Sequence, residues 1–257
     1  MAETVIRIEG LSLCYRLAHQ KVHSLKDYLI HVLRGALSYR DLWALKEISL
    51  EIGPGEVVGV IGRNGAGKST LSKVISRVLK PSRGAIHVKG KVSPILELGV
   101  GLDFELTGVE NIFLMALFRG YSRAEIEAKA ESIAEFSGLG EFIHSPVRNY
   151  STGMIARLSF AIATAWKPDV LVLDEVLAVG DSRFIGRCHE RLREFREAGT
   201  TVILVSHSPL EILHQCTRCI WLDGGMLVAD GTPLDVVARY AESAGDHETL
   251  ALIRGGA

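Results

Sequence analysis

The segment at residues 62–70, GRNGAGKST, constrains the fold more than any other part of the chain. It follows the apolar run VVGVI and precedes LSKVISRVLK, in which apolar residues recur at helical spacing until Pro81. The pattern GxxxxGK followed by Ser or Thr binds phosphate when it lies between a buried strand and a helix. The sequence therefore predicts a phosphate-binding loop in an α/β fold, in preference to an incidental glycine turn.

The residue types in this loop suit a triphosphate. Gly62, Gly65 and Gly67 allow backbone N–H groups to approach phosphate oxygens without a Cβ in the way, and the helix N-terminus adds partial positive charge. Lys68 is expected to bridge the β and γ phosphates, and the Ser69 hydroxyl to bind Mg²⁺. We expect ATP and Mg²⁺ as ligands, and the other members of the predicted nucleotide-binding loop are Arg63, Asn64, Ala66 and Thr70.

Two acidic residues follow the apolar strand VLVL further along the chain. Asp174 stands where a carboxylate steadies Mg²⁺ through water, and Glu175 is placed to polarise the water that attacks the γ-phosphate. His207 follows another apolar strand and is predicted to lie beside that phosphate. Acids at a strand end can simply be solvated, and a lone histidine after a strand is more often structural. Beside a phosphate loop we favour catalysis, by Glu175, His207 and Lys68.

An aromatic face suits a purine base, and two aromatic residues are candidates for that contact. Tyr15, at the end of the first predicted strand, is predicted to stack on adenine, with Trp43 as the alternative. Either residue could instead be an ordinary aromatic at a strand end.

Helices alternate with buried strands along most of the chain, which predicts a mostly parallel sheet covered on both faces. Strands are expected at 5–15 and 44–52, and helices over much of 106–137 and at 153–166. Ser122, three residues before Glu125, is a plausible helix cap. The chain has 257 residues, of which 47% are hydrophobic, so we expect one domain over residues 1–245, with a helical subdomain at about 100–160, and a short tail at 246–257.

Charge and cysteine content argue against several classes of protein. The net charge of −1 disfavours nucleic acid as a partner, because proteins that bind it present a strongly basic surface. The four cysteines are scattered and the N-terminus has no apolar signal core, which points to the reducing cytoplasm. Cys216 and Cys219 have the CxxC spacing of zinc and redox sites, but without a second pair a helix or strand edge is the better interpretation. No apolar run approaches the ~18 residues that span a bilayer, so a membrane role requires a partner.

Residues 150–154, YSTGM, precede the helix that leads into VLVLDE. This segment resembles the LSGGQ signature of the ABC ATPases, which it matches at Ser151 and Gly153, and Val179-Gly180-Asp181 stands in the place of their D-loop. The resemblance covers nearly the whole chain. It implies the ABC ATPase fold: a RecA-like core with a mostly parallel sheet, an antiparallel β subdomain and a helical subdomain that carries the signature.

The resemblance also implies a homodimer. In that family, the signature of one subunit closes over the ATP held by the phosphate loop of the other subunit. Ser151, the Gly153 backbone and a helix N-terminus would offer donors to the γ-phosphate from the far side, and Asp181 would cross the interface.

Two departures from the common family pattern narrow the resemblance. Glu97 occupies the position that we align with the Q-loop glutamine, and it is a candidate ligand for Mg²⁺. Val176 replaces the proline that commonly follows the catalytic glutamate. Together with YSTGM, these residues resemble the branch that exports O-antigen, capsule and teichoic acid. That branch implies an integral membrane channel subunit in two copies, a lipid-linked polysaccharide as substrate, and a peripheral position at the cytoplasmic face of the bacterial inner membrane.

Members of the O-antigen group often append a β-sandwich that binds the sugar chain, and we expect a form that lacks it. Another exported substrate, such as teichoic acid or a lipid, is an alternative. A further alternative is a soluble ABC protein that acts in translation or DNA repair, although such proteins normally carry two cassettes or a long coiled coil.

Residues 24–37 carry apolar side chains at a spacing of three and four residues, with lysine and arginine on either side. This pattern predicts an inserted amphipathic helix. The helix could lie at a membrane surface beside anionic head groups or against the channel subunit, whereas the alternative is that it packs on its own sheet. Because the polysaccharide exporters have a helix here at the membrane face, we favour the membrane side.

Overall fold

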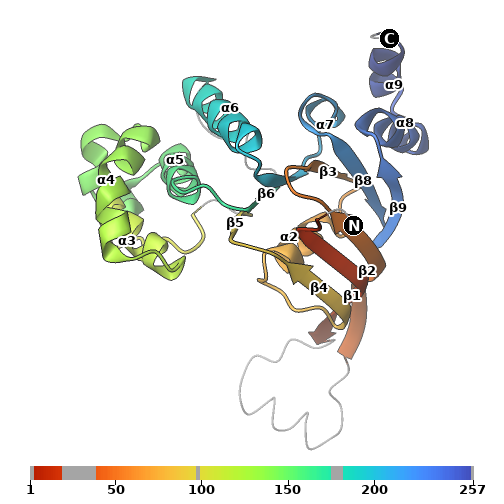
Figure 1. Ribbon diagram of the computed structural model, residues 1–257, viewed down its shortest axis with the longest axis horizontal. Helices are drawn as coiled ribbons and strands as arrows, with labels where there is room; N and C mark the ends of the chain where they lie inside the picture. The colour runs from red at the N-terminus through yellow and green to blue at the C-terminus, as the bar shows by residue number, and fades with distance from the viewer. Residues whose placement is uncertain (1–2, 19–38, 97–98, 175–181, 256–257) are drawn as a thin grey trace, which may run out of the picture.

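The computed structural model describes residues 3–18, 39–96, 99–174 and 182–255, which form two β-sheets and a separate group of helices (Figure 1). The larger sheet has the strand order β5-β6-β7-β3-β8-β9. Its first five strands are parallel to their neighbours, and β9 joins the edge antiparallel to β8. In sheet order the strands are β5 (Val92–Ile95), β6 (Val170–Asp174), β7 (Thr201–Val205), β3 (Val57–Ile61), β8 (Arg218–Asp223) and β9 (Met226–Gly231).

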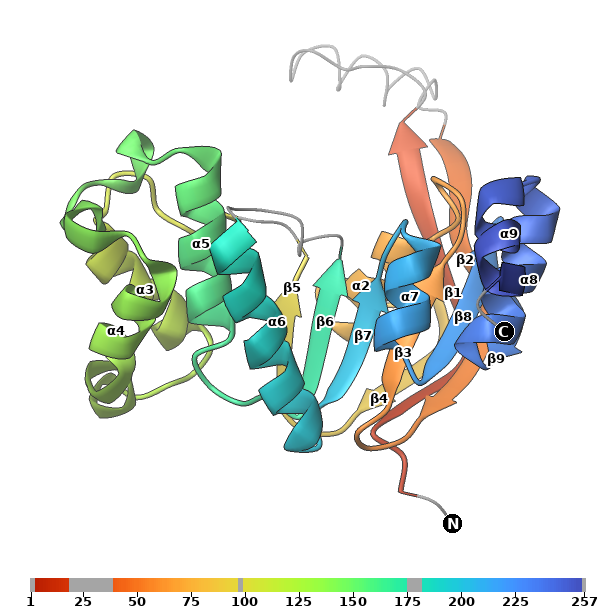
Figure 2. The same ribbon diagram turned by 90° about the horizontal axis from the view of Figure 1, so that it is seen from above.

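Both faces of this sheet are covered, so every residue of β3, β6 and β7 is buried. Alternate residues of these strands therefore belong to two different hydrophobic clusters. One face packs against α2 (Lys68–Ile75) and the second sheet. The other face packs against α6 (Ser182–Glu197), α7 (Pro209–Gln215) and α8 (Pro233–Ala244) (Figure 2). Burial on both sides explains why these strands are continuous apolar runs in the sequence.

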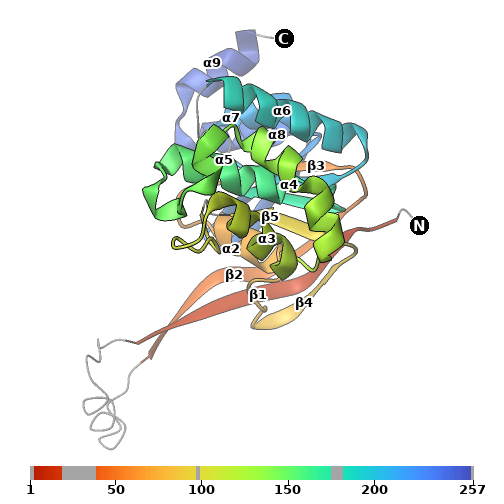
Figure 3. The ribbon, with the colours of Figure 1, turned by 90° about the vertical axis from the view of Figure 1, so that its left-hand side faces the viewer.

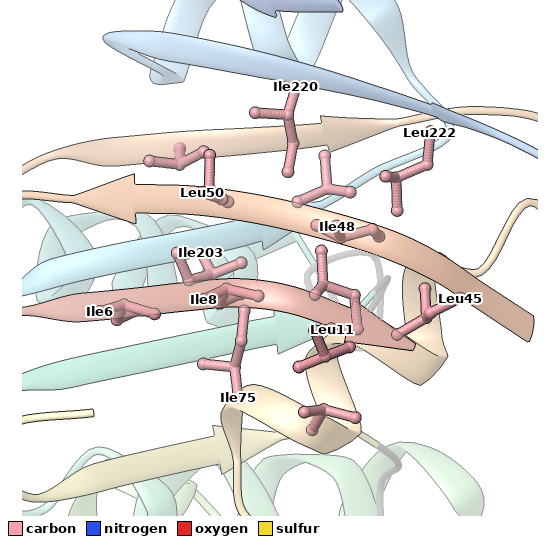
Figure 4. Close-up of a cluster of buried hydrophobic side chains, with 14 of the residues drawn as sticks. Ile6, Ile8, Leu11, Leu45, Ile48, Leu50, Ile75, Ile203, Ile220 and Leu222 are labelled. Carbon is pink, nitrogen blue, oxygen red and sulfur yellow. The ribbon is translucent and has the colours of Figure 1, made fainter. Parts of the chain in front are cut away.

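The second sheet is antiparallel and has the order β2-β1-β4. Strands β1 (Ile6–Ala18) and β2 (Tyr39–Ile52) pair along their whole length and project from the body as a ribbon (Figure 3). Both strands extend beyond the predicted 5–15 and 44–52, because their outer ends pair with each other. Strand β4 (Arg83–Val88) pairs with the other edge of β1. Isoleucine and leucine side chains from β1 and β2 fill the space between this sheet, α2 and the larger sheet (Figure 4).

The charged guanidinium of Arg218 in β8 connects the two sheets through hydrogen bonds. Its guanidinium donates two hydrogen bonds to the carboxylate of Asp230, at 2.7 and 2.6 Å. The same guanidinium donates to the Glu51 carbonyl at 2.8 Å and to the Glu56 carboxylate at 3.1 Å. The bidentate contact with Asp230 raises the pKa of Arg218, so this arginine stays charged and holds β2, β8 and β9 together.

The helical subdomain has a hydrophobic cluster of its own. It contains α3 (Gly108–Phe118), α4 (Arg123–Ser137), the short helices η1 (Gly140–His144) and η2 (Val147–Asn149), and α5 (Thr152–Ala163). The predicted cap at Ser122 is confirmed: its hydroxyl accepts from the Glu125 N–H, and the Glu125 carboxylate accepts from the Ser122 N–H. Helix α5 ends three residues before the predicted 166, and the Thr164 hydroxyl donates to the Phe160 carbonyl at that end.

Two other element boundaries differ from the predictions. Helix α2 ends at Ile75 instead of continuing toward Pro81, since Arg77 adopts a left-handed backbone with φ 60° and its guanidinium donates to the Val88 carbonyl. The predicted tail contains a helix, α9 (His247–Gly255). The Asp246 carboxylate accepts hydrogen bonds from the Thr249 N–H and hydroxyl at its N-terminus, and Ile253 packs against the core. A cap and one apolar anchor thus support a helix in a segment whose composition is small and polar.

The two cysteines of the CxxC segment, Cys216 and Cys219, lie at the end of a helix and in a strand. All four cysteines are free thiols, with Cys216 at the end of α7 and Cys219 buried in β8. Burial raises the pKa of the Cys216 thiol to about 12, which keeps it protonated and unreactive. Among the described residues there is no group of three or more metal-binding side chains, and no helix of the described segments is long and apolar enough to cross a membrane.

Candidate functional site

The phosphate-binding loop has the strand, loop and helix context that the sequence predicted. Strand β3 enters the loop, and α2 begins at Lys68 after a left-handed Gly67 with φ 104°. Two glycines are required by close approach: a Cβ on Gly62 would lie 2.2 Å from the Leu222 carbonyl oxygen, and one on Gly67 would lie 2.6 Å from the Ala44 carbonyl oxygen. The loop is therefore pressed against β8 and β2, and no larger residue fits at these two positions.

Lys68 is nearly buried, with 5% of its surface exposed. Its ammonium donates to the Gly62 carbonyl at 2.8 Å and to the Arg63 carbonyl at 3.3 Å, so the side chain follows the curve of the loop. The N-cap of α2 is Gly67, and no side chain of the described residues caps this helix. The N–H groups of its first turn have no acceptor within the helix, and together with the lysine they suit an anion.

This loop forms one side of a pocket of about 480 Å³, which is within the usual range for small ligands. Both candidate aromatics line it. The Tyr15 hydroxyl lies 3.4 Å from Thr70 Oγ1, and the Arg83 guanidinium covers the Trp43 ring, 5.0 Å from its centroid. The other lining residues are Leu42, Ala44, Asn64, Gly65, Ala66, Gly67, Lys68, Ser69, Thr70 and His207. The pocket thus offers an aromatic end for a base and a cationic end for phosphate.

The carboxyl ends of three adjacent strands bring Asp174, His207 and the phosphate loop to the same edge of the sheet. Asp174 ends β6 with 8% of its surface exposed and lies opposite Val205 of β7. His207 follows β7 after one residue, and β7 pairs with β3, which enters the phosphate loop. Carboxylate and hydroxyl oxygens are the ligands that Mg²⁺ prefers, so Asp174 and the exposed Ser69 fit that ion.

The turn that carries His207 is fixed by residues that the sequence analysis did not single out. The Ser206 hydroxyl donates to the Glu211 carboxylate at 2.5 Å, and the Ser208 N–H donates to the Ser206 hydroxyl at 3.0 Å. Ser208 also caps α7 by accepting from the Glu211 N–H. The spacing of Ser208 and Glu211 is that of a capping box, which could have been recognised from the sequence.

The signature segment lies at the N-terminus of another helix. Ser151 is exposed and caps α5, with its hydroxyl accepting from the Met154 N–H at 3.3 Å. Among the described residues the space beside Gly153 is open, since an added Cβ would have only the Ser151 hydroxyl within 4 Å, at 3.9 Å. Tyr150 anchors the segment by donating to the Phe142 carbonyl at 2.7 Å, and burial raises the pKa of its phenol. Neither Ser151 nor Gly153 lines the pocket of the phosphate loop.

Residues 45–178, just over half of the chain, match the ABC transporter family. The chain belongs to this family. Membership confirms the predicted resemblance and implies that this ABC protein binds a nucleotide. The predicted fold class is confirmed as well. The chain is similar to a solved structure of an ATP-binding subunit of an ABC transporter, with a TM-score of 0.73, 25% identity and coverage of 98% of this chain and 100% of that one.

Two kinds of export protein are among the relatives of this ABC protein. It is 40% identical over 243 residues to the O-antigen export system ATP-binding protein RfbB of Klebsiella pneumoniae, covering 94% of this chain and 99% of the relative. It is 46% identical over 201 residues to the teichoic acids export ATP-binding protein TagH of Lactococcus lactis, covering 78% of this chain and 43% of the relative. A dimeric ATP-binding cassette bound to ADP and Pi shares its fold, with a TM-score of 0.70, 22% identity and coverage of 89% of this chain and 98% of that one.

Several predictions for this ABC protein lie outside the described residues: Glu97, Glu175, Val176, Asp181 and the inserted helix at 24–37. Of those that lie inside, Tyr15, Trp43, Lys68 and His207 line one pocket, and Asp174 ends the strand β6 beside β7. Ser151 and Gly153 instead lie at the N-terminus of α5. Leu42 and Ala44, which also line the pocket, carry no pattern in the sequence that could have indicated it.

Proposed function

We propose that this protein is the ATP-hydrolysing subunit of an ABC exporter that moves a lipid-linked, O-antigen-like polysaccharide across the bacterial inner membrane. The observation that carries the ATPase part is the pocket in which the phosphate loop, two aromatic rings and His207 lie together. The names of the export relatives support the polysaccharide part.

In the proposed reaction, Tyr15 stacks on the adenine, and the loop at 62–70 binds the phosphates through its backbone N–H groups and Lys68. Ser69 would bind Mg²⁺ and Asp174 would hold it through water, with Glu97 as a further candidate ligand. When bound, the metal ion would neutralise part of the negative charge on the phosphates. Glu175 accepts a proton from the attacking water, and His207 contacts the γ-phosphate. The turn held by Ser206 and Glu211 orients His207 for that contact.

We further propose that the protein works as a homodimer. Ser151 and Gly153 lie at an exposed helix N-terminus and do not line the phosphate-loop pocket of their own chain. They would bind the γ-phosphate held by a second copy, and Asp181 would contact that copy across the interface. Because each site would then use residues of both chains, ATP would join the two subunits and hydrolysis would release them.

The proposed partner is an integral membrane channel subunit in two copies, which handles the lipid-linked polysaccharide. The ATPase, with residues 1–245 as a single nucleotide-binding domain, would lie peripherally at the cytoplasmic face of the inner membrane. The inserted helix at 24–37 would contact the lipid surface or the channel. Teichoic acid or a lipid is the second candidate substrate, because the relatives include a teichoic acid exporter.

The decisive change for the ATPase is Glu175→Gln. The amide keeps the size of the side chain but cannot accept the proton of the attacking water, so hydrolysis should fall by about 10²–10⁴ while ATP binding is retained. Steady-state ATPase assays and equilibrium ATP titration measure the two effects separately. Wild-type turnover in this variant would refute the assignment of Glu175.

A second experiment tests the transport part. The protein is captured from membranes under mild detergent, and the co-purifying proteins are identified. Recovery of an integral membrane subunit supports the exporter, whereas recovery of ribosomes or DNA in its place would support a soluble ABC protein.

A further inference from the structure

A second pocket lies between α4 of the helical subdomain and α6 of the core, at the C-terminal end of α5. It has a volume of about 290 Å³. Ile133 and Phe136 of α4 and Phe195 of α6 form its apolar walls, and the end of α5 forms its floor. We name it the α4–α6 groove. None of its lining residues lines the phosphate-loop pocket.

Cationic side chains from three segments converge on this groove. Lys129 of α4 donates to the Ala165 carbonyl at 2.8 Å, and Arg191 of α6 donates to the adjacent Thr164 carbonyl at 2.8 Å. Lys167 also lines the groove and donates to the Ala198 carbonyl at the end of α6. Because Thr164 and Ala165 are neighbours in the chain, the charges of Lys129 and Arg191 are held close together.

The local charge is not balanced. Glu194 is the only acidic side chain that lines the described groove, and it lies 3.5 Å from the Arg191 Nε. The carbonyl ends of α5 and α6 each supply roughly half a negative charge. Set against three cations, these groups leave about one positive charge uncompensated. Arg187 does not line the groove, but its guanidinium lies 5.4 Å from the centroid of Phe136, which does.

The two lysines have N–H donors left for a ligand. A lysine ammonium has three N–H donors, and within the described structure Lys129 and Lys167 each donate a single hydrogen bond. Arg191 is held in place by the Phe136 ring, whose centroid lies 4.4 Å from its guanidinium carbon. Two ammonium groups and a fixed guanidinium, from three segments that line one groove, match a group with several anionic oxygens.

We propose that the α4–α6 groove binds a phosphate group, either as a free phosphate or as the head group of a phosphorylated lipid. The phosphate oxygens would accept from Lys129, Lys167 and Arg191 at once. A phosphate bound there would connect the helical subdomain, which carries Lys129, to the core, which carries Lys167 and Arg191.

Calorimetric titration of inorganic phosphate into the full chain, saturated with MgADP, tests the proposal. The wild type should show a saturable phosphate site, and Lys129→Gln and Lys167→Gln should each weaken it at least about tenfold, through loss of one charge-assisted hydrogen bond. Lys129→Arg, which keeps the charge, should restore most of the affinity. Lys80→Gln removes an exposed lysine outside the groove and should bind phosphate as the wild type does.

Flotation with vesicles distinguishes the two sources of phosphate. Binding to vesicles with phosphatidic acid, lost in the Lys129 and Lys167 variants and absent with phosphatidylcholine alone, identifies a lipid head group. Phosphate binding without vesicle binding identifies a free phosphate. The proposal is overturned if the wild type has no saturable phosphate site, or if both glutamine variants bind phosphate like Lys80→Gln. Thermal unfolding verifies the fold, and Lys167→Gln alone decides the result if Lys129→Gln is unfolded.

Discussion

The N-termini of α2 and α5 offer the same kind of anion site in two different settings. Helix α2 begins inside a pocket, where Lys68 is buried and Gly62 and Gly67 are pressed against neighbouring strands. Helix α5 begins at the surface, where Ser151 is exposed and the space beside Gly153 is open. The first site already has walls and a buried cation from its own chain. The second has donors but no walls, as expected of a half-site that a second copy completes.

The largest expected effect comes from Gly62→Ala. The added Cβ would collide with the Leu222 carbonyl, so the free energy of unfolding should fall by about 3 kcal/mol. Gly65→Ala is the matched control, because the space beside Gly65 is open and only its left-handed backbone, with φ 79°, is unfavourable. It should cost about 1–2 kcal/mol. Urea denaturation measures both, and equal losses would show that the α2 site is not closely packed.

Lys68→Ala removes the cation from the α2 site without changing its walls. Charge-assisted hydrogen bonds contribute about 1.5–3 kcal/mol each, so ATP affinity should fall by roughly 10- to 100-fold. Fluorescence titration with ATP measures the change. Lys80→Ala serves as the control for loss of charge, and an unchanged affinity in Lys68→Ala would contradict the role of this pocket.

Tyr15→Ala tests the aromatic end of the same pocket. Loss of one stacking partner for a base costs about 1–3 kcal/mol, and Tyr15→Phe should retain most of the affinity because the ring is kept. Trp43→Ala should have the smaller effect of the two aromatic variants. ATP titration measures both losses of affinity. A larger loss in Trp43→Ala than in Tyr15→Ala would assign the base contact to Trp43.

Gly153→Ala should have the smallest effect on the free energy of unfolding of the isolated chain. It tests the α5 site, the second of the two anion sites compared above. The open space accepts a methyl group, and alanine favours a helix over glycine by up to about 1 kcal/mol, so the free energy of unfolding should stay the same or rise. In the Glu175→Gln background, however, ATP-dependent dimer formation should weaken. Sedimentation velocity with and without ATP measures this, and a dimer as stable as that of Glu175→Gln alone would remove Gly153 from the interface.

Local sequence determined the parts of this protein that depend on neighbours in the chain. The strand, loop and helix around residues 62–70 follow from apolar runs, glycine and the lysine that opens α2. The cap formed by Ser122 and Glu125 is equally local. Hydrogen bonds that close within a few residues, and burial patterns with a fixed period, are properties that a short stretch of sequence carries by itself.

Only the tertiary structure decided which distant residues meet. Leu42 and Trp43 line the pocket because β2 pairs with β1, opposite Tyr15 and Cys14. The early end of α2 depends on a contact between Arg77 and β4, and the α4–α6 groove exists because two subdomains pack together. Such contacts join residues far apart in the chain, and their geometry comes from side-chain packing across whole elements, which no local pattern specifies.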